Sequence, residues 1–329
     1  MKKLQQRQIL IILTLTAVNC LLLILALKIG QIEISWSGLR EIFSGTPDGT
    51  ILRELRLARS LAAMIAGGAA ALAGVILQKV LRNSLAAPDI LGISSGAGLA
   101  GVGLLLLFPQ WAEFLNGAAF AGALLTAALI TLAAWKKGLS PIRLILAGVA
   151  ISALFAALTG GLILFHADKL FPVMEFTLGG FSGKSLSDVT RILPLAAFLL
   201  ILTLFLPRKL ELLSLGELEA TALGASVKSS RFLALTTAAL AASLTVSLAG
   251  LLGFTGLMAP HIARKLANSS DSRNLLITAP LTGSALTLLG DLIGRTIFAP
   301  REIPAGLPIS IAGAIFFLTL LSSSKKEME

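Results

Sequence analysis

Cysteine, tyrosine and charge are scarce in this chain of 329 residues, which has one cysteine, no tyrosine and 13% Asp, Glu, Lys and Arg. A single cysteine excludes an internal disulfide and says nothing about the redox compartment. Soluble domains carry about 25% charged residues, so a large surface facing water is hard to build from this composition. With 56% hydrophobic residues and a mean hydropathy of +0.90, the sequence predicts a protein that lies in a membrane.

The side-chain groupings that enzymes use are also missing. His166 and His261 stand alone, and no cluster of Cys, His and Asp has the spacing of metal ligands. Residues 96–101 match G-x-G-x-x-G but lie inside an apolar run with no strand before it. Residues 178–185 resemble a phosphate loop, yet Leu178 occupies its first glycine position. We therefore expect no catalytic residue, no metal, no cofactor and no nucleotide site in this chain.

Long apolar runs dominate the sequence. Runs of about 18 or more apolar residues are long enough to cross a bilayer. The candidate spans are residues 9–27, 57–81, 90–108, 115–135, 142–165, 192–206, 232–252, 275–293 and 305–321. Residues 254–267 are shorter and contain Pro260, which is typical of a half-span or re-entrant helix. Counting this segment predicts ten helices, one transmembrane domain over residues 1–329, and both termini on one side.

The first apolar run could instead be a signal peptide, because it follows a basic start. A signal core is about 7–15 residues long and ends at a small-residue cleavage site. Residues 9–27 are longer and are followed by Lys28, and Cys20 follows Asn19 where a lipoprotein signal has a small residue. We expect an uncleaved first span.

Basic residues set the expected orientation. The formal net charge is +10, which could suggest a nucleic-acid partner, but Lys and Arg collect in the cytoplasmic loops of membrane proteins. Most of them fall in those loops if the N-terminus is cytoplasmic. We therefore expect no nucleic acid, a multi-pass protein of the bacterial cytoplasmic membrane, and cytoplasmic termini. Residues 82–92 then face the cytoplasm.

Four arginines depart from this charge rule, the first of them Arg53 at the start of the second span. Arg56 and Arg59 begin the second span on the outer side, three residues apart on one helix face, and Arg295 ends the ninth span there. They indicate a partner that needs positive charge; the alternative is that they snorkel to the interface from helix ends. Asp291 lies in the same span, four residues before Arg295, and we expect the two to pair.

Acidic residues are otherwise absent from the spans. Ion-coupled transporters commonly place ionisable residues deep in the membrane, so a proton-driven or sodium-driven carrier is disfavoured. A bundle without a proton relay or a nucleotide site is either passive or driven by a partner.

Leucines and acids alternate in residues 211–219, ELLSLGELE. Helices that lie on a lipid surface favour Lys and Arg on their polar face. Because this segment is acidic, its pattern favours a protein groove as the partner.

Six segments together resemble the FecCD family, the permease subunits of ATP-binding-cassette (ABC) importers for iron–siderophore complexes, haem and vitamin B12. They are residues 56–59, 74–78, 82–92, 213–224, 253–264 and 299–306. Each motif is weak alone, but six in order at matching spacing, over nearly the whole chain, are specific. Ala58 and Ser84 stand where the family often has proline, which removes no charge.

The resemblance implies an all-α, BtuC-like (type II ABC importer) bundle of about ten helices. It also implies a second permease subunit, identical or related, and two cytoplasmic ATPases that bind ATP and Mg. An extracytoplasmic substrate-binding protein would deliver a ferric chelate. Asp89 favours an iron–siderophore, because the vitamin B12 branch often has glycine there. Haem or vitamin B12 remain alternatives within the family, and an ATPase-independent channel or carrier is the alternative outside it.

The resemblance also assigns roles to individual residues. Arg56, Arg59 and Arg295 would dock acidic side chains of the binding protein. Residues 211–226, here called the coupling segment, would sit in a groove of the ATPase through Leu213, Leu215, Gly216, Glu217, Leu218 and Gly224. Structural loop motifs would comprise Arg82, Asn83, Pro88, Asp89, Gly92, Pro260 and His261, with His261 a buried turn residue. We expect Asn83 or Ser84 to cap backbone ends, and residues 82–92 to brace the coupling segment.

Overall fold

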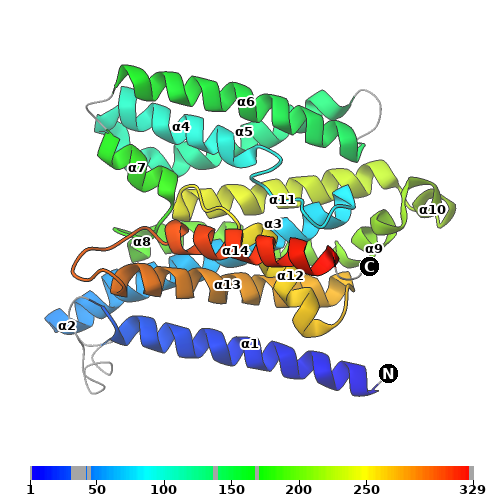
Figure 1. Ribbon diagram of the computed structural model, residues 1–329, viewed down its shortest axis with the longest axis horizontal. Coiled ribbons are helices and arrows are strands. Elements are labelled where there is room, and N and C mark those ends of the chain that lie inside the picture. Colours follow the sequence, from blue (N-terminus) through cyan, green and yellow to red (C-terminus); the bar gives the residue numbers. More distant parts are fainter. Residues whose placement is uncertain (1, 31–41, 43–45, 136–139, 167–169, 326–329) are drawn as a thin grey trace.

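Helices account for all the regular secondary structure in the part of the chain that the computed structural model describes, residues 2–30, 42, 46–135, 140–166 and 170–325. The elements are α1 (Lys2–Lys28), α2 (Pro47–Thr50), the π-helical η2 (Ile51–Leu57), α3 (Ala58–Leu81), α4 (Ile93–Leu107), the 3-10 helix η3 (Pro109–Phe114), α5 (Leu115–Trp135), α6 (Pro141–Phe165), α7 (Leu170–Leu178), α8 (Leu186–Leu204), α9 (Pro207–Leu215), α10 (Glu217–Ala222), α11 (Val227–Ala249), α12 (Thr255–Ala267), α13 (Ser272–Thr296) and α14 (Gly306–Lys325). Figure 1 shows most of the long helices running side by side.

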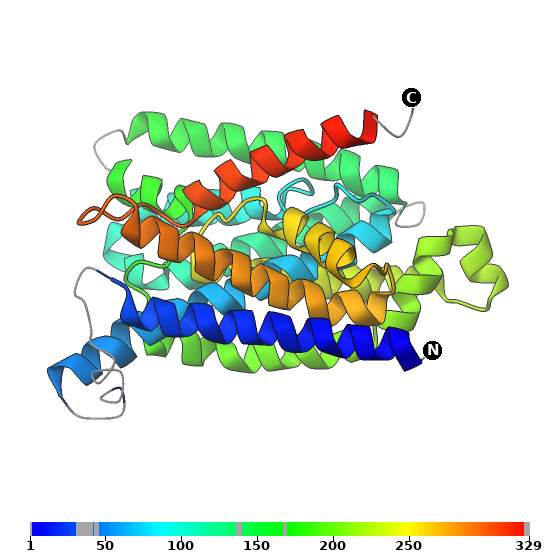
Figure 2. The same cartoon turned by 60° about the horizontal axis from the view of Figure 1, so that its bottom comes forward.

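All ten predicted helices are confirmed: α1, α3, α4, α5, α6, α8, α11, α12, α13 and α14. Seven helical segments of the described chain are long and apolar enough to cross a membrane, while α4 and α14 are shorter apolar helices. The 13-residue α12 is the predicted short element. We call the end of the bundle where α3 begins and α13 ends the arginine end. The opposite end, where α1 begins and α14 ends, carries α9 and α10 and is called the α10 end (Figures 1 and 2).

The sequence did not predict α7, nor the early start of α8. The polar loop after α7 ends in a capping box at Ser185: its hydroxyl accepts from the amide of Asp188, and its own amide donates to the Asp188 carboxylate at 3.0 Å. Such reciprocal bonds satisfy amides that a helix leaves unpaired at its start. The segment that resembles a phosphate loop is therefore a helix start.

At the centre of the bundle lies α3, a helix rich in alanine and glycine that is buried along most of its length. Gly67 faces Gly283 and Thr287 of α13 so closely that an added Cβ would overlap both. Polar bonds add to this packing: Ser284 donates to the carbonyl of Met64 at 2.7 Å. Small residues let helix backbones approach in lipid, where apolar side chains gain little by associating.

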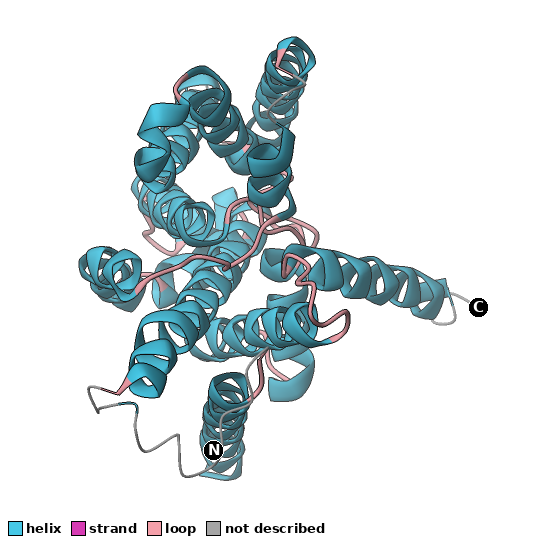
Figure 3. Ribbon diagram, turned by 90° about the vertical axis from the view of Figure 1, so that its left-hand side faces the viewer, coloured by secondary structure: helices cyan, strands magenta, loops and turns pink. Residues whose placement is uncertain are grey.

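A second group of helices, α4, α5 and α6, packs against one side of this centre (Figure 1). Gly96 of α4 fits closely against Gly122 and Thr126 of α5. Seen from the arginine end, α14 projects away from the rest of the bundle (Figure 3).

We expect Gly67→Ala to lower the stability of the protein in detergent by about 1–3 kcal/mol, the usual cost of overpacking. Gly160→Ala on α6 is the matched control, because no atom lies within 4 Å of a Cβ added there and alanine favours helix over glycine. Thermal unfolding checks both variants. Equal stability of the two would contradict the close crossing of α3 and α13.

Candidate functional site

Five charged side chains from η2, α3, α13 and the loop after α13 meet at the arginine end. We call them the arginine cluster: Arg56, Arg59, Asp291, Arg295 and Glu302. The fully buried Asp291 carboxylate lies 2.9 Å from Nη2 of Arg59 and 3.2 Å from Nε of Arg295. Glu302 accepts a bond of 2.6 Å from Nη1 of Arg59. The predicted Asp291–Arg295 pair is confirmed, and Arg59 shares the same carboxylate.

Glu302 reaches this cluster because the chain folds back directly after α13. The amide of Ile303 donates to the carbonyl of Gly294 at 3.0 Å. A Cβ on Gly294 would lie 2.5 Å from the carbonyl oxygen of Ile303, so only glycine fits this approach. The return places the carboxylate of Glu302 over α3.

Arg56 is held by the end of α1. It projects from the π-helical turn η2, is 7% exposed, and donates to the carbonyls of Leu27 and Lys28 at 2.7 and 2.9 Å. Arg295, which is 4% exposed, donates to the carbonyl of Ala26 at 3.3 Å. Cations favour the last carbonyls of a helix, which have no intrahelical partner. The two arginines therefore cap α1.

The three predicted arginines thus come together from distant parts of the sequence, but most of their surface is buried. The Arg59 side chain is 12% exposed. A cavity of about 350 Å³ opens beside them, lined by Arg56, Arg59, Arg295, Lys184 and Glu302 among others. Within the described chain, Nη2 of Arg295 is buried and has no hydrogen-bond partner. We call this cavity the positive cleft, because its lining carries four cations and one carboxylate.

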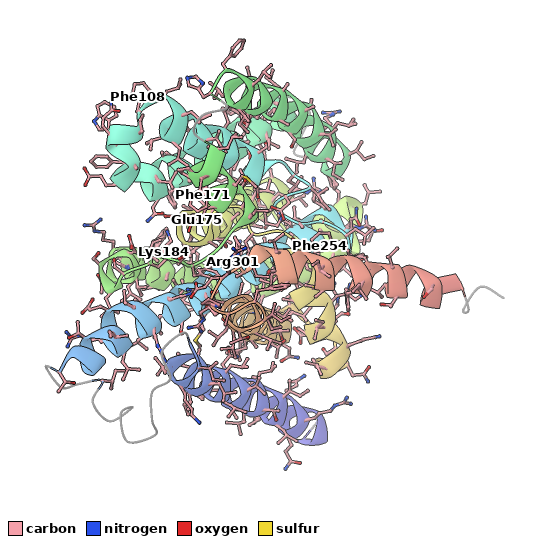
Figure 4. The ribbon with its side chains drawn as sticks, turned by 60° about the vertical axis from the view of Figure 1, so that its left-hand side comes forward. Phe108, Phe171, Glu175, Lys184, Phe254 and Arg301 are labelled. Carbon is pink, nitrogen blue, oxygen red and sulfur yellow. The ribbon has the colours of Figure 1, made fainter. Side chains whose placement is uncertain are left out.

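Lys184 is a cation of this cleft that the sequence analysis missed. Its ammonium donates to Oδ1 of Asn116 at 2.8 Å and lies 3.5 Å from the carbonyl of Ser247. Burial lowers the pKa of Lys184, although the charges of Asp188 and Glu175 oppose the shift. Figure 4, which brings the arginine end toward the viewer, labels Lys184 and Arg301 there. In the sequence, Lys184 stands at the lysine position of the segment that resembles a phosphate loop. That resemblance was the one feature that could have pointed to Lys184.

A second cluster, here called the Glu211 cluster, lies at the α10 end, where α3 ends and α13 begins. Glu211 of α9 accepts from Nζ of Lys79 at 3.1 Å, and from the amide and hydroxyl of Ser272 at 2.7 and 2.6 Å. Lys79 is in the last turn of α3, and Ser272 begins α13. Burial alone would raise the pKa of Glu211, but the bonds from Ser272 and the charge of Lys79 outweigh it and hold that pKa below its usual value.

The coupling segment is a bent pair of short helices. Gly216 separates α9 from α10 with a φ of 127°, a conformation that favours glycine. Leu213 is buried against the bundle, and Glu217 pairs with Arg231 of α11 at 2.9 Å. Leu215 and Leu218 are 51% and 84% exposed, and Gly224 turns the chain toward α11 with a φ of 78°. Apolar side chains are therefore presented at the α10 end.

Residues 82–92 form the predicted turn beside this segment. Arg82 ends α3 in the left-handed conformation, and Oδ1 of Asn83 accepts from the amide of Leu85 at 2.9 Å. Asn83 therefore closes the turn between the helices, and the expected cap of a helix end is wrong: Arg82 ends α3 and Gly92 precedes α4 without a side-chain cap. Pro88 is buried in the turn, and Asp89 accepts a hydrogen bond from Ser94 in the first turn of α4.

Gly92 is the residue directly before α4 and has a φ of 79°. A Cβ on Gly216 would lie 3.4 Å from Nη1 of Arg82. The turn and the coupling segment are therefore neighbours.

The prediction for Pro260 and His261 as loop residues is wrong. Both lie inside α12, and His261 is half-buried with its ring edge-on to Phe316, at 5.9 Å between centroids. Phe254, in the left-handed conformation, is the residue before the helix. Because α12 begins at Thr255, Pro260 falls in its second turn. Proline has no amide to donate to the carbonyl of Gly256, four residues earlier in the helix. Helices in membrane proteins tolerate such a proline where neighbouring groups satisfy the freed carbonyl.

Comparison with known proteins places the chain. A family model described as the FecCD transport family matches residues 16–323. The chain belongs to the FecCD transport family. It is 36% identical over 96% of its length to the Fe(3+)-citrate import system permease protein YfmE of Bacillus subtilis, covering 96% of that protein. It is 39% identical over 94% of its length to the Fe(3+) dicitrate transport system permease protein FecD of Escherichia coli, covering 97% of it.

A solved structure shares the fold of this FecCD chain. It is described as an inward-facing conformation of a metal-chelate type ABC transporter, with 28% identity and a TM-score of 0.83 over 95% of this chain and 99% of that one. The chain is accordingly a membrane-spanning subunit of the ABC permease type. Among its described residues, no group of three or more His, Cys, Asp and Glu is placed to hold a metal ion.

Acidification tests the Glu211 cluster of this FecCD protein. Because the folded-state pKa of Glu211 is lowered, its bonds stabilise the fold above the ordinary glutamate pKa, and this contribution is lost as pH falls through the lowered value. Glu211→Gln should therefore lower the melting temperature at pH 7 and narrow the difference between pH 7 and pH 4. Glu219→Gln, on the exposed side of α10, should leave that difference unchanged. A full pH difference in Glu211→Gln would contradict the assignment.

Proposed function

We propose that this FecCD chain is the permease subunit of an ABC importer that moves a ferric chelate across the cytoplasmic membrane. Family membership is the observation that carries the proposal, since two relatives of similar length are named as iron(III) citrate permeases. The chain would be the conduit, and the energy would come from partner ATPases that bind ATP and Mg. A second permease subunit, identical or related, would complete the pathway.

The coupling segment is the proposed contact with the ATPase. Leu215 and Leu218 are exposed on a projecting bend of two short helices. Large apolar side chains gathered on an exposed surface are typical of protein interfaces. Leu213 would anchor the segment to the bundle, and the glycines at 216 and 224 would set its shape.

The positive cleft is the proposed contact with an extracytoplasmic substrate-binding protein. A carboxylate that enters it would meet Arg56, Arg59 and Lys184, with the charge of the buried Arg295 beside them. Charge-assisted bonds between arginine and carboxylate are directional as well as strong. Because Glu302 already bonds to Arg59, an incoming carboxylate would share or displace that bond.

These two contacts fix the proposed orientation. If the α10 end meets the ATPases, it faces the cytoplasm, and so do the start of α1 and the end of α14. The arginine end is then the outer end. The basic residues of the predicted cytoplasmic loops support this orientation.

We expect Arg295→Met to weaken docking of the binding protein by about 10- to 100-fold, because one of the four cations that line the cleft is lost. Arg191→Met is the matched control, because Arg191 is exposed on α8 and does not line the positive cleft. Affinity is measured on the complete transporter in nanodiscs at two salt concentrations, since docking through charge weakens as salt rises. Unchanged docking in a folded Arg295→Met transporter would refute the proposed contact.

We expect Leu218→Asp to weaken binding of the ATPase by at least about 30-fold, because a charge replaces an apolar anchor at the interface. Leu218→Met, which keeps an apolar side chain, should retain the ATPase. Co-purification and ATP-dependent uptake of ferric citrate into proteoliposomes measure both effects. Uptake by the chain alone, without an ATPase, would show that it is a passive channel or carrier.

A further inference from the structure

The antiparallel helices α3 and α13 connect the two charged clusters. Their middle sections are held by the Gly67–Gly283 contact and by the bond from Ser284 to the carbonyl of Met64. Closely packed interiors move as units, because packing this dense leaves little room for independent displacement. Figure 2 shows α13 lying along the length of the bundle, from the arginine end to the α10 end.

Each end of this helix pair is closed by one shared carboxylate. At the arginine end, Asp291 of α13 accepts hydrogen bonds from Arg59 of α3 and forms an ion pair with Arg295 of its own helix. At the α10 end, Glu211 bonds to Lys79 of α3 and to Ser272 of α13. Arg59 and Lys79 are twenty residues apart on one helix, which is about 30 Å.

The two carboxylates differ in where they come from. Asp291 belongs to the helix pair itself, whereas Glu211 belongs to α9, the first half of the coupling segment. Lys79 also donates to the carbonyl of Ser270 at 2.7 Å, so the chain just before α13 is held at the same point. The coupling segment is thus bonded to both helices whose far ends line the positive cleft.

We propose that Glu211 is a positioning residue that transmits binding-protein docking to the ATPases, by fixing the coupling segment to the α3–α13 pair. This inference rests on the proposed function. A carboxylate docked in the positive cleft acts on Arg59 and Arg295, which belong to α3 and α13. The pair shifts as one body, and the bonds from Lys79 and Ser272 to Glu211 move α9 with it.

The coupling segment has a second ion pair, which provides the matched control. Glu217 pairs with Arg231 of α11 at 2.9 Å, and this bond does not reach α3 or α13. Arg231→Met therefore loosens the same segment by removing one ion pair, but leaves the bonds to the α3–α13 pair intact.

The test compares ATP hydrolysis by the complete transporter in nanodiscs with and without ferric-citrate-loaded binding protein. In Glu211→Gln and in Lys79→Met, we expect the ratio of stimulated to basal rate to fall by about 2- to 30-fold, the range of single-residue coupling effects. Lys79→Arg keeps the charge and should retain the ratio, as should Arg231→Met. Docking affinity without nucleotide should stay within about twofold of wild type in all four variants, since none of these residues lines the positive cleft.

A purely structural role for Glu211 would give a different result: stimulated and basal rates would fall together and their ratio would be kept. That result, or an equal fall of the ratio in Arg231→Met, would overturn the proposal. The wild-type transporter separates this failure from failure of the proposed function. If the binding protein neither docks on wild type nor stimulates it, the proposed function is wrong; if it does both and Glu211→Gln behaves identically, only the role of Glu211 is wrong.

Discussion

In a bilayer, an apolar side chain gains little by leaving lipid for a neighbouring helix, so α3 must be held by close backbone contact and polar bonds. Its glycines and alanines allow that contact on several sides at once: Gly67 meets α13, and Gly74 meets Gly256 of α12. Hydroxyls complete it, as Thr245 of α11 donates to the carbonyl of Ala66 at 3.1 Å. The positions of both charged clusters follow, because each is built on the ends of α3 and its partner α13.

Charge at the arginine end is arranged around a buried acid. An isolated carboxylate is costly to bury, and pairing with hydrogen-bonded cations offsets that cost. Asp291 has two arginines within 3.2 Å, while the lining of the positive cleft still holds more cations than carboxylates. The same residues can therefore stabilise the end of the bundle and leave a positive field directed at the cleft.

The sequence predicted the membrane-spanning helices well, because the length of an apolar run can be read directly from consecutive residues. It also predicted the Asp291–Arg295 pair and the turn at Asn83, which depend on residues close together in the chain. Glu302 and Lys184 were missed, since their places follow from how distant loops fold back. Pro260 and His261 were taken as loop residues although the segment around them was predicted as a short helix, because proline within a helix usually breaks it. Burial of Arg56 and Arg295 was also beyond the sequence, since both donate to carbonyls at the end of α1.

The π-helical turn η2 explains why Arg56 and Arg59 have different partners although they are three residues apart. A wider turn precedes the α-helix, so Arg56 points to the end of α1 and Arg59 points to Asp291. π-Helical turns occur often at functional sites, and each residue of an α-helix rotates the chain by about 100°. A single insertion or deletion within residues 51–57 would rotate the chain before it relative to α3, and would disturb both the buried Leu52 and the contact of Arg56 with the end of α1. The wider turn thus lets one continuous helical segment supply a cation to the end of α1 and another to Asp291.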